Sequence, residues 1–174
     1  MSHPSKLVVF SGLPGTGKST LAREVAHRLP AVWLRVDTVE ASVVGAGIVR
    51  SFETGLAGYT VVRDLARDNL AVGRDVVIDA VNGVEPARRM WRDLAEELRA
   101  KRFTIEVRCS DLAEHRRRAE SRVPPTPPLP LPTWEAVTDR EFEPWDEPVL
   151  TIDALRPPEE NVDRILVYCS WQRS

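Results

Sequence analysis

The sequence predicts an α/β domain in which a parallel sheet carries helices on both faces. Short apolar runs alternate along the chain with stretches whose apolar residues repeat every four positions, as in buried strands and helices. The length of 174 residues suits one domain, which would bury roughly 70% of the surface of its unfolded chain. Hydrophobic residues at 43% and charged residues at 29% are typical of a globular protein.

Five segments have the composition of strands. Residues 6–11 form an apolar run that ends at a turn rich in glycine and proline, which is typical of a buried strand. The four later segments are also short and apolar, and predicted helices separate them; they cover residues 31–36, 75–80, 103–109 and 149–153. A strand that is followed by a helix and then by another strand pairs in parallel, so we expect a five-stranded parallel sheet.

The helical periodicity is clearest at residues 85–100. Pro86 suits the first turn of a helix, and Met90, Leu94 and Leu98 repeat every four residues. The glycines of residues 55–58 predict a break before another helix. The remaining predicted helices cover residues 19–29, 38–50, 59–72, 111–122 and 158–169.

A proline-rich segment interrupts the alternation. Residues 123–132 contain six of the 14 prolines, so they fit neither a helix nor a central strand. They lie between two core elements, which favours a stiff loop that projects over a binding cleft above the alternative of a plain linker. We therefore expect a single domain over residues 1–174, with a proline-rich lid at about 116–147.

Charge and cysteine content restrict the class of protein. Lys and Arg total 24 against 26 for Asp and Glu, whereas a nucleic-acid-binding domain would be basic. No apolar run approaches the ~18 residues that span a bilayer, and no apolar segment of a signal peptide precedes the first strand. With Cys109 and Cys169 as the only cysteines, we expect a cytoplasmic protein without disulfides or a membrane role.

The strongest motif lies between the first strand and the first helix. Residues 12–19 match the pattern GxxxxGK[ST] in the strand-to-helix context that the motif requires. Glycines let the backbone N–H groups point at an anion, Lys18 reaches the β- and γ-phosphates, and the Ser19 hydroxyl binds Mg²⁺. The predicted nucleotide-binding residues in this loop are Gly12, Pro14, Gly15, Thr16, Gly17, Lys18, Ser19 and Thr20.

Two carboxylates follow predicted strands. Ligands of open parallel sheets lie at the carboxyl ends of the strands, so Asp37 is a candidate general base for an attacking hydroxyl. A helix N-cap is the alternative for Asp37. Asp79 is the candidate second ligand of Mg²⁺, with a turn residue as the alternative, and Asn82 is a weaker candidate of the same kind.

Arginines gather on the predicted helix that leads into the proline-rich segment. Arg118 and Arg122 are four residues apart and share a face, where they could hold the nucleotide and the transferring phosphoryl group. Taken singly, Arg116, Arg117 and Arg118 are better interpreted as a solvated face paired with Glu114 and Glu120, whereas Arg122 is not. Trp134 and Trp145 could cover a base, although packing is the commoner role of such residues; they lie in or after the proline-rich segment.

These motifs resemble the AAA-type kinases that include chloramphenicol phosphotransferase, polynucleotide 5′-kinases and zeta-type toxins. GLPGTGKST at 12–20, the strand-end Asp37, VVIDAVN at 76–82 and the arginine-bearing helix occur in the order of that group. The resemblance implies ATP, Mg²⁺, and transfer of the γ-phosphate to a hydroxyl, with Asp37 as base and Arg122 or a neighbour as the lid arginine. Polynucleotide kinases carry an arginine three residues after the aspartate, where this sequence has Glu40.

Three functions are compatible with these motifs. The leading one is a kinase of a hydroxyl-bearing small molecule, with Asp37 as the base. The first alternative is a nucleotide or polynucleotide 5′-hydroxyl kinase, for which Arg88, Arg89 and Arg92 could bind a phosphate. The second is an ATP-dependent regulatory module without a transfer reaction, whose proline run docks to a partner. The sequence leaves open the acceptor, the choice between ATP and GTP, and the oligomeric state.

Overall fold

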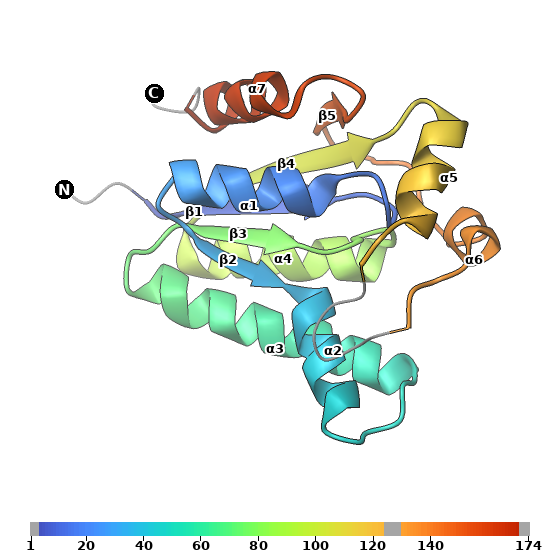
Figure 1. Ribbon diagram of the computed structural model, residues 1–174. Coiled ribbons are helices and arrows are strands. Elements are labelled where there is room, and N and C mark those ends of the chain that lie inside the picture. The colour runs from blue at the N-terminus through green and yellow to red at the C-terminus, as the bar shows by residue number, and fades with distance from the viewer. Residues whose placement is uncertain (1–3, 124–129, 171–174) are drawn as a thin grey trace.

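The computed structural model describes residues 4–123 and 130–170, and a five-stranded sheet forms its centre (Figure 1). The strand order is β2-β3-β1-β4-β5, and every neighbouring pair is parallel. The strands are β1 (Lys6–Ser11), β2 (Val32–Arg35), β3 (Val76–Asp79), β4 (Lys101–Arg108) and β5 (Leu150–Asp153). The predicted parallel sheet of five strands is confirmed.

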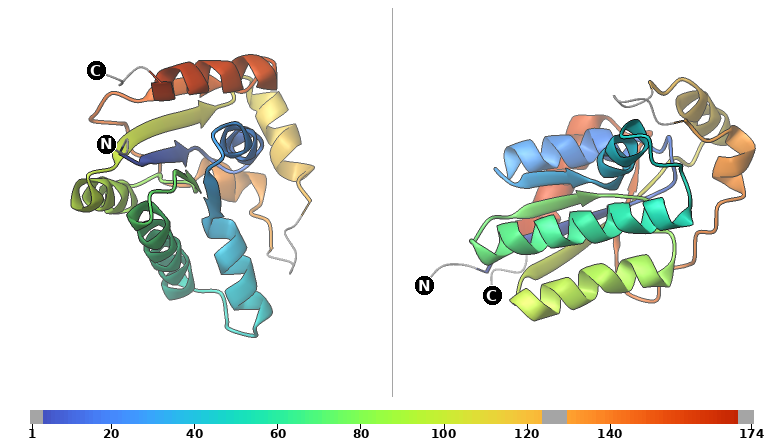
Figure 2. Two further views of the ribbon diagram at one scale, coloured as in Figure 1. Left: turned by 90° about the vertical axis from the view of Figure 1, so that its left-hand side faces the viewer. Right: turned by 90° about the horizontal axis from the view of Figure 1, so that it is seen from below.

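Helices cover both faces of the sheet, as predicted (Figure 2). Val8 and Phe10 of β1 pack with α1 (Lys18–Arg28) and α7 (Pro158–Ser170). Leu7 and Val9 point the other way and pack with α3 (Phe52–Ala71) and α4 (Glu85–Leu98), because successive side chains of a strand alternate between its faces. Two apolar cores therefore hold β1 in place, and the phosphate-loop motif begins where this strand ends.

The predicted break at residues 55–58 is wrong, because α3 begins at Phe52 and runs through both glycines. The Ser51 Oγ accepts a hydrogen bond from the Thr54 backbone N–H, and the Thr54 Oγ1 accepts one from the Ser51 N–H, a capping box that starts the helix. A Cβ atom on Gly58 would lie 3.4 Å from Val36 Cγ1 of α2 (Val36–Gly45). This glycine therefore serves the close packing of α2 against α3.

The segment after α5 (Leu112–Glu120) contains a helix that the sequence pattern did not reveal. Thr133 is the N-cap of helix α6 (Trp134–Thr138), and its Oγ1 accepts a hydrogen bond from the Ala136 N–H at 3.2 Å. The Trp134 ring packs edge-on against His115 of α5, with 5.1 Å between the ring centroids. Most of the proline run, residues 124–129, lies outside the described residues, so the lid remains a prediction.

The described helices also bear on a membrane role. None of the helices within residues 4–123 and 130–170 is both long enough and apolar enough to cross a bilayer.

Candidate active site

The loop between β1 and α1 has a shape that only glycine fits at two positions. Gly12 and Gly15 have φ angles of 148° and 84°, which side chains rarely allow. A Cβ atom on Gly12 would lie 2.4 Å from the Val107 carbonyl oxygen, and one on Gly15 would lie 2.8 Å from Ala119 Cα. The loop is thus enclosed by β4 on one side and by α5 on the other.

Asn82, directly after β3, anchors the start of the loop. Its Nδ2 donates to the Phe10 carbonyl at 2.8 Å, and its Oδ1 accepts from the Trp91 indole at 2.8 Å. The side chain is fully buried, so both ends of its amide are occupied inside the protein. Asn82 therefore positions the loop, and the suggestion that it binds magnesium or substrate is wrong.

A pocket of about 580 Å³ extends from the loop to the turn after β5, a size within the ~300–1,000 Å³ typical of small-molecule sites. Its walls include Lys18, which is 5% exposed, and the turn that follows Asp153. Six predicted nucleotide or phosphoryl contacts line it together: Gly15, Gly17, Lys18, Ser19, Thr20 and Arg118, with Arg122 beside them.

The turn after β5 is held in place from two sides. The buried Asn161 of α7 donates from Nδ2 to the Asp153 carbonyl at 3.0 Å. Arg118 of α5 donates from Nη1 to the Ala154 carbonyl at 3.1 Å, which ties the two walls of the pocket together. Asp153 accepts from the Ser110 hydroxyl, a bond that lowers the pKa of its carboxyl group. This turn could flank a bound base.

The arginines of α5 differ in what they contact. Arg116 pairs with Glu120, and Arg117 with Glu114, so for these two the solvated-face interpretation fits. Arg118 also pairs with Glu114, at 2.6 Å, but it additionally lines the pocket of about 580 Å³. Hydrogen bonds from Arg117 and Arg118 lower the pKa of Glu114 to about 2.

Asp79 ends β3 and is 3% exposed. Its Oδ2 accepts from Arg35 Nε at 3.2 Å, and no hydrogen bond to Oδ1 occurs in the described part of the chain. The described residues contain no cluster of three or more His, Cys, Asp or Glu side chains suited to a metal. The donor set of the Ser19 hydroxyl and the Asp79 carboxylate still suits Mg²⁺, which usually completes its shell with phosphate oxygens and water.

Asp37 lies in the first turn of α2, with Arg35 as the N-cap, so the alternative that Asp37 caps the helix is wrong. Its Oδ2 is 3.5 Å from Arg122 Nη2 of the segment after α5. Both side chains line a second, narrow pocket of about 50 Å³, which also includes Lys18. The predicted base and the predicted lid arginine are therefore brought together, although 85 residues separate them.

The second pocket also contains charged residues that no sequence motif singles out. Glu40 and Arg50 form an ion pair of 2.8 Å, and Arg140 lines the same pocket after α6. The Tyr59 hydroxyl accepts from the Asn82 N–H nearby, and burial raises the pKa of Tyr59 to about 12. Arg50 and Arg140 lie in connections without a motif, so no local signal could have found them.

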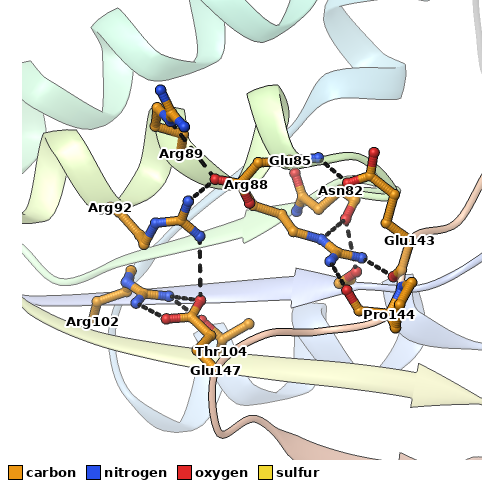
Figure 3. A network of polar contacts seen from close by, with 11 residues as sticks. Asn82, Glu85, Arg88, Arg89, Arg92, Arg102, Thr104, Glu143, Pro144 and Glu147 are labelled. Carbon is orange, nitrogen blue, oxygen red and sulfur yellow. Dashed lines mark hydrogen bonds and ion pairs between the residues drawn. The ribbon is translucent and has the colours of Figure 1, made fainter.

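The arginines of α4 that were candidates for a phosphate contact belong to a separate network of polar contacts (Figure 3). Arg88 is 3% exposed and donates to the carbonyls of Asn82, Gly83, Glu143 and Pro144. Arg92 pairs with Glu85 and Glu147, and Arg89 lies near Glu85. Trp145 stacks on Arg88, with the guanidinium 3.7 Å from the ring centroid. Trp145 and Trp134 therefore have packing roles, and the arginines of α4 lose their support as phosphate ligands.

A protein-family model described as an AAA domain matches residues 7–144, which is most of the chain. The chain belongs to the AAA domain family. Among curated proteins it is 31% identical over 111 residues to the bifunctional polynucleotide phosphatase/kinase of Schizosaccharomyces pombe, which covers 64% of this chain and 22% of that protein. The chain spans 62% or less of the length of the curated relatives that it matches.

Solved structures share the fold of this AAA domain. A putative kinase from Chloroflexus aurantiacus has a TM-score of 0.77 at 20% identity, covering 99% of this chain and 100% of that one. The Mycobacterium tuberculosis APS kinase CysC, in complex with AMPPNP and APS, has a TM-score of 0.73 at 19% identity, covering 95% and 98%. The expected resemblance to phosphate-loop kinases is confirmed, and the fold is that of a kinase.

Within this AAA domain, Lys18 and Arg122 line both pockets. The wide pocket and the narrow one therefore meet at these two cations. A cationic junction between two binding spaces is suited to stabilising a group that carries negative charge while it passes from one to the other.

Proposed function

We propose that the protein is an ATP-dependent phosphotransferase that moves the γ-phosphate of ATP to a hydroxyl of a small molecule. The observation that carries the proposal is the junction of the two pockets at Lys18 and Arg122, with Asp37 on the far side. ATP would occupy the pocket of about 580 Å³. The acceptor hydroxyl would lie beside Asp37, where the space of about 50 Å³ is smaller than a small-molecule site and would have to widen when an acceptor binds. The fold of kinases such as APS kinase supports this assignment.

Each step of the transfer has a candidate residue. The acceptor oxygen forms the new bond to the γ-phosphorus, its proton passes to the Asp37 carboxylate, and the electrons of the broken P–O bond leave with ADP. Lys18 and Arg122 balance the charge of the phosphoryl oxygens. Ser19 and Asp79 would hold Mg²⁺, which neutralises phosphate charge when it is bound.

The contact between Arg122 and Asp37 fits this assignment. At 3.5 Å, it is long for a charged hydrogen bond, which is usually 2.7–2.9 Å. An arginine that is held this loosely can exchange the carboxylate for a phosphoryl oxygen, and the exchange would free Asp37 to accept a proton.

One observation favours the regulatory alternative. Exposed apolar side chains lie in the connection between α2 and α3 and at the start of α3, with Val49 83% and Phe52 82% exposed. Exposed apolar patches often mark surfaces that bind partners. This alternative predicts slow hydrolysis of ATP that no small acceptor stimulates.

Release of ADP from Mg²⁺-ATP tests the proposal. The purified protein is assayed with water alone and with pools of hydroxylated metabolites, nucleosides and 5′-hydroxyl oligonucleotides. We expect one small-molecule pool to raise ADP release well above the water background, with ³²P recovered in the acceptor. Stimulation by oligonucleotides alone would favour the polynucleotide kinase. ATP binding without stimulation by any pool would favour the regulatory module.

A further inference from the structure

The acceptor pocket has more positive than negative charge. It is lined by four cations, Lys18, Arg50, Arg122 and Arg140, and by two carboxylates, Asp37 and Glu40. Arg50 neutralises Glu40 at 2.8 Å, and Arg122 faces Asp37 at 3.5 Å. From its position in the sequence, Glu40 would repel an anionic acceptor. In the folded protein its charge is neutralised by Arg50, so this repulsion is removed.

After these two pairs, Lys18 and Arg140 are the remaining cations of the pocket. Lys18 belongs to the phosphate loop and faces the nucleotide. Arg140 forms no ion pair within the described residues. Residues 1–3, 124–129 and 171–174 contain no Asp or Glu, so no carboxylate side chain outside the described part can neutralise it either. Arg140 is the cation of this pocket whose charge the protein leaves unbalanced.

The backbone just after Arg140 is fixed by the network around Arg88 (Figure 3). The Glu143 N–H donates to the Gly83 carbonyl at 2.8 Å, and Arg88 donates to the Glu143 and Pro144 carbonyls at 2.6 and 2.9 Å. A Cβ atom on Gly83 would lie 2.7 Å from the Glu141 carbonyl oxygen, so the two chain segments are in close contact. Arg140 thus starts from an anchored segment, unlike an arginine at the tip of a loop.

From this charge and this anchoring, we propose that the acceptor carries an anionic group, a carboxylate, sulfate or phosphate, and that Arg140 binds it. The inference rests on the proposed phosphotransferase. A guanidinium group offers a planar pair of N–H donors that matches two oxygens of such an anion. Arg140 would hold the anionic end of the acceptor while Asp37 takes the proton from its hydroxyl. Arg140 is a binding residue in this account, and it takes no part in the transfer itself.

Matched pairs of acceptors test the proposal. The pairs are an aldonate with its alditol, and a nucleoside with its 5′-monophosphate, each assayed by ADP release. We expect the anionic member of at least one pair to be the better substrate of the wild type by ~10-fold or more in kcat/KM, the value of about one charged hydrogen-bonded contact. Arg140→Gln should raise the KM for that anion by a similar factor, and Arg140→Lys should recover part of the loss.

Arg74→Gln is the matched control. Like Arg140, Arg74 is exposed and has no ion pair in the described part of the chain, but it lies just before β3, at the opposite ends of the strands from the site. It should leave the preference for the anion intact. If the neutral member of each pair is used as well as the anion, or if Arg140→Gln lowers kcat/KM equally for both members, the inference is wrong and the phosphotransferase stands. If no acceptor of either kind stimulates ADP release, the proposed function itself fails. Thermal unfolding of both variants checks that neither effect comes from loss of the fold.

Discussion

The two sides of Lys18 are built in different ways. On the nucleotide side, one continuous stretch between residues 15 and 21 supplies one wall of the pocket, and α5 with the residues after it, the turn after β5 and the start of α7 supply the others. On the acceptor side, the wall comes from short pieces far apart in the chain, at Asp37, Glu40, Arg50, Arg122 and Arg140. A local motif predicts the phosphate-binding loop. The acceptor side depends instead on how α2, the residues after α5 and the segment after α6 pack together.

The largest effect is expected at Lys18, one of the two residues that line both pockets. Lys18→Ala removes the cation at the junction of the pockets, so we expect turnover to fall by ~10³-fold or more, as for other groups that stabilise transition-state charge. The ADP-release assay at saturating ATP measures this loss. Arg23→Ala is the control, since Arg23 is exposed on the same helix and has no ion pair in the described residues. Turnover within a few-fold of wild type in Lys18→Ala would remove the junction from the mechanism.

The second-largest effect is expected on the stability of the fold, at the Arg88 network behind the acceptor side. Arg88→Met removes four hydrogen bonds that a buried guanidinium donates to backbone carbonyls, and we expect it to lower the free energy of unfolding by ~3 kcal/mol or more. Urea unfolding measures the change. Arg89→Met on the same helix is the control, because Arg89 is 67% exposed and its pair with Glu85 spans 3.7 Å. Equal stability of the two variants would show that the Arg88 network does not anchor the segment around Glu143 and Pro144.

Asp37→Asn tests the acceptor side alone. The amide cannot accept the proton of the attacking hydroxyl, so we expect kcat to fall by ~10²-fold or more while the Kd of ATP stays within about threefold. Asp68→Asn is the control, since Asp68 is exposed on α3 and has no ion pair in the part of the chain that the structure describes. A weaker affinity for ATP with an unchanged kcat would instead assign Asp37 to the nucleotide side.

The contrast between the two sides also explains what the sequence could predict. The parallel sheet and the phosphate loop follow from local patterns, because strand runs and GxxxxGK[ST] each lie within a few consecutive residues. The glycine break at 55–58 failed because packing against Val36 and the capping box at Ser51 outweigh the low helix propensity of glycine. Arg140 and Arg50 could not be predicted, because only the folded chain brings them to Asp37.

The smallest effect is expected on the nucleotide side, at the exposed ion pairs of α5. Glu114 has a pKa of about 2 in the folded protein, below its usual value near 4.5, because Arg117 and Arg118 donate to it. A depressed pKa stabilises the fold fully above the unfolded value and loses its contribution as the pH falls toward the folded one. The difference in stability between wild type and Glu114→Gln should therefore be constant from pH 7 to about pH 5, shrink below that, and vanish near pH 2.

Because the Glu114 side chain is partly open to solvent, this difference should be small. Its measurable consequence lies in Arg118, which Glu114 holds at the edge of the pocket proposed for the nucleotide. We expect Glu114→Gln to raise the KM for ATP by about two- to threefold without changing the KM of the acceptor, as the loss of one weak, solvent-screened pair would. Glu120→Gln, which removes only the pair with Arg116, should change neither constant. A rise in the acceptor KM from Glu114→Gln would show that α5 serves both sides of Lys18, and the division between a locally encoded nucleotide side and an assembled acceptor side would no longer hold at this helix.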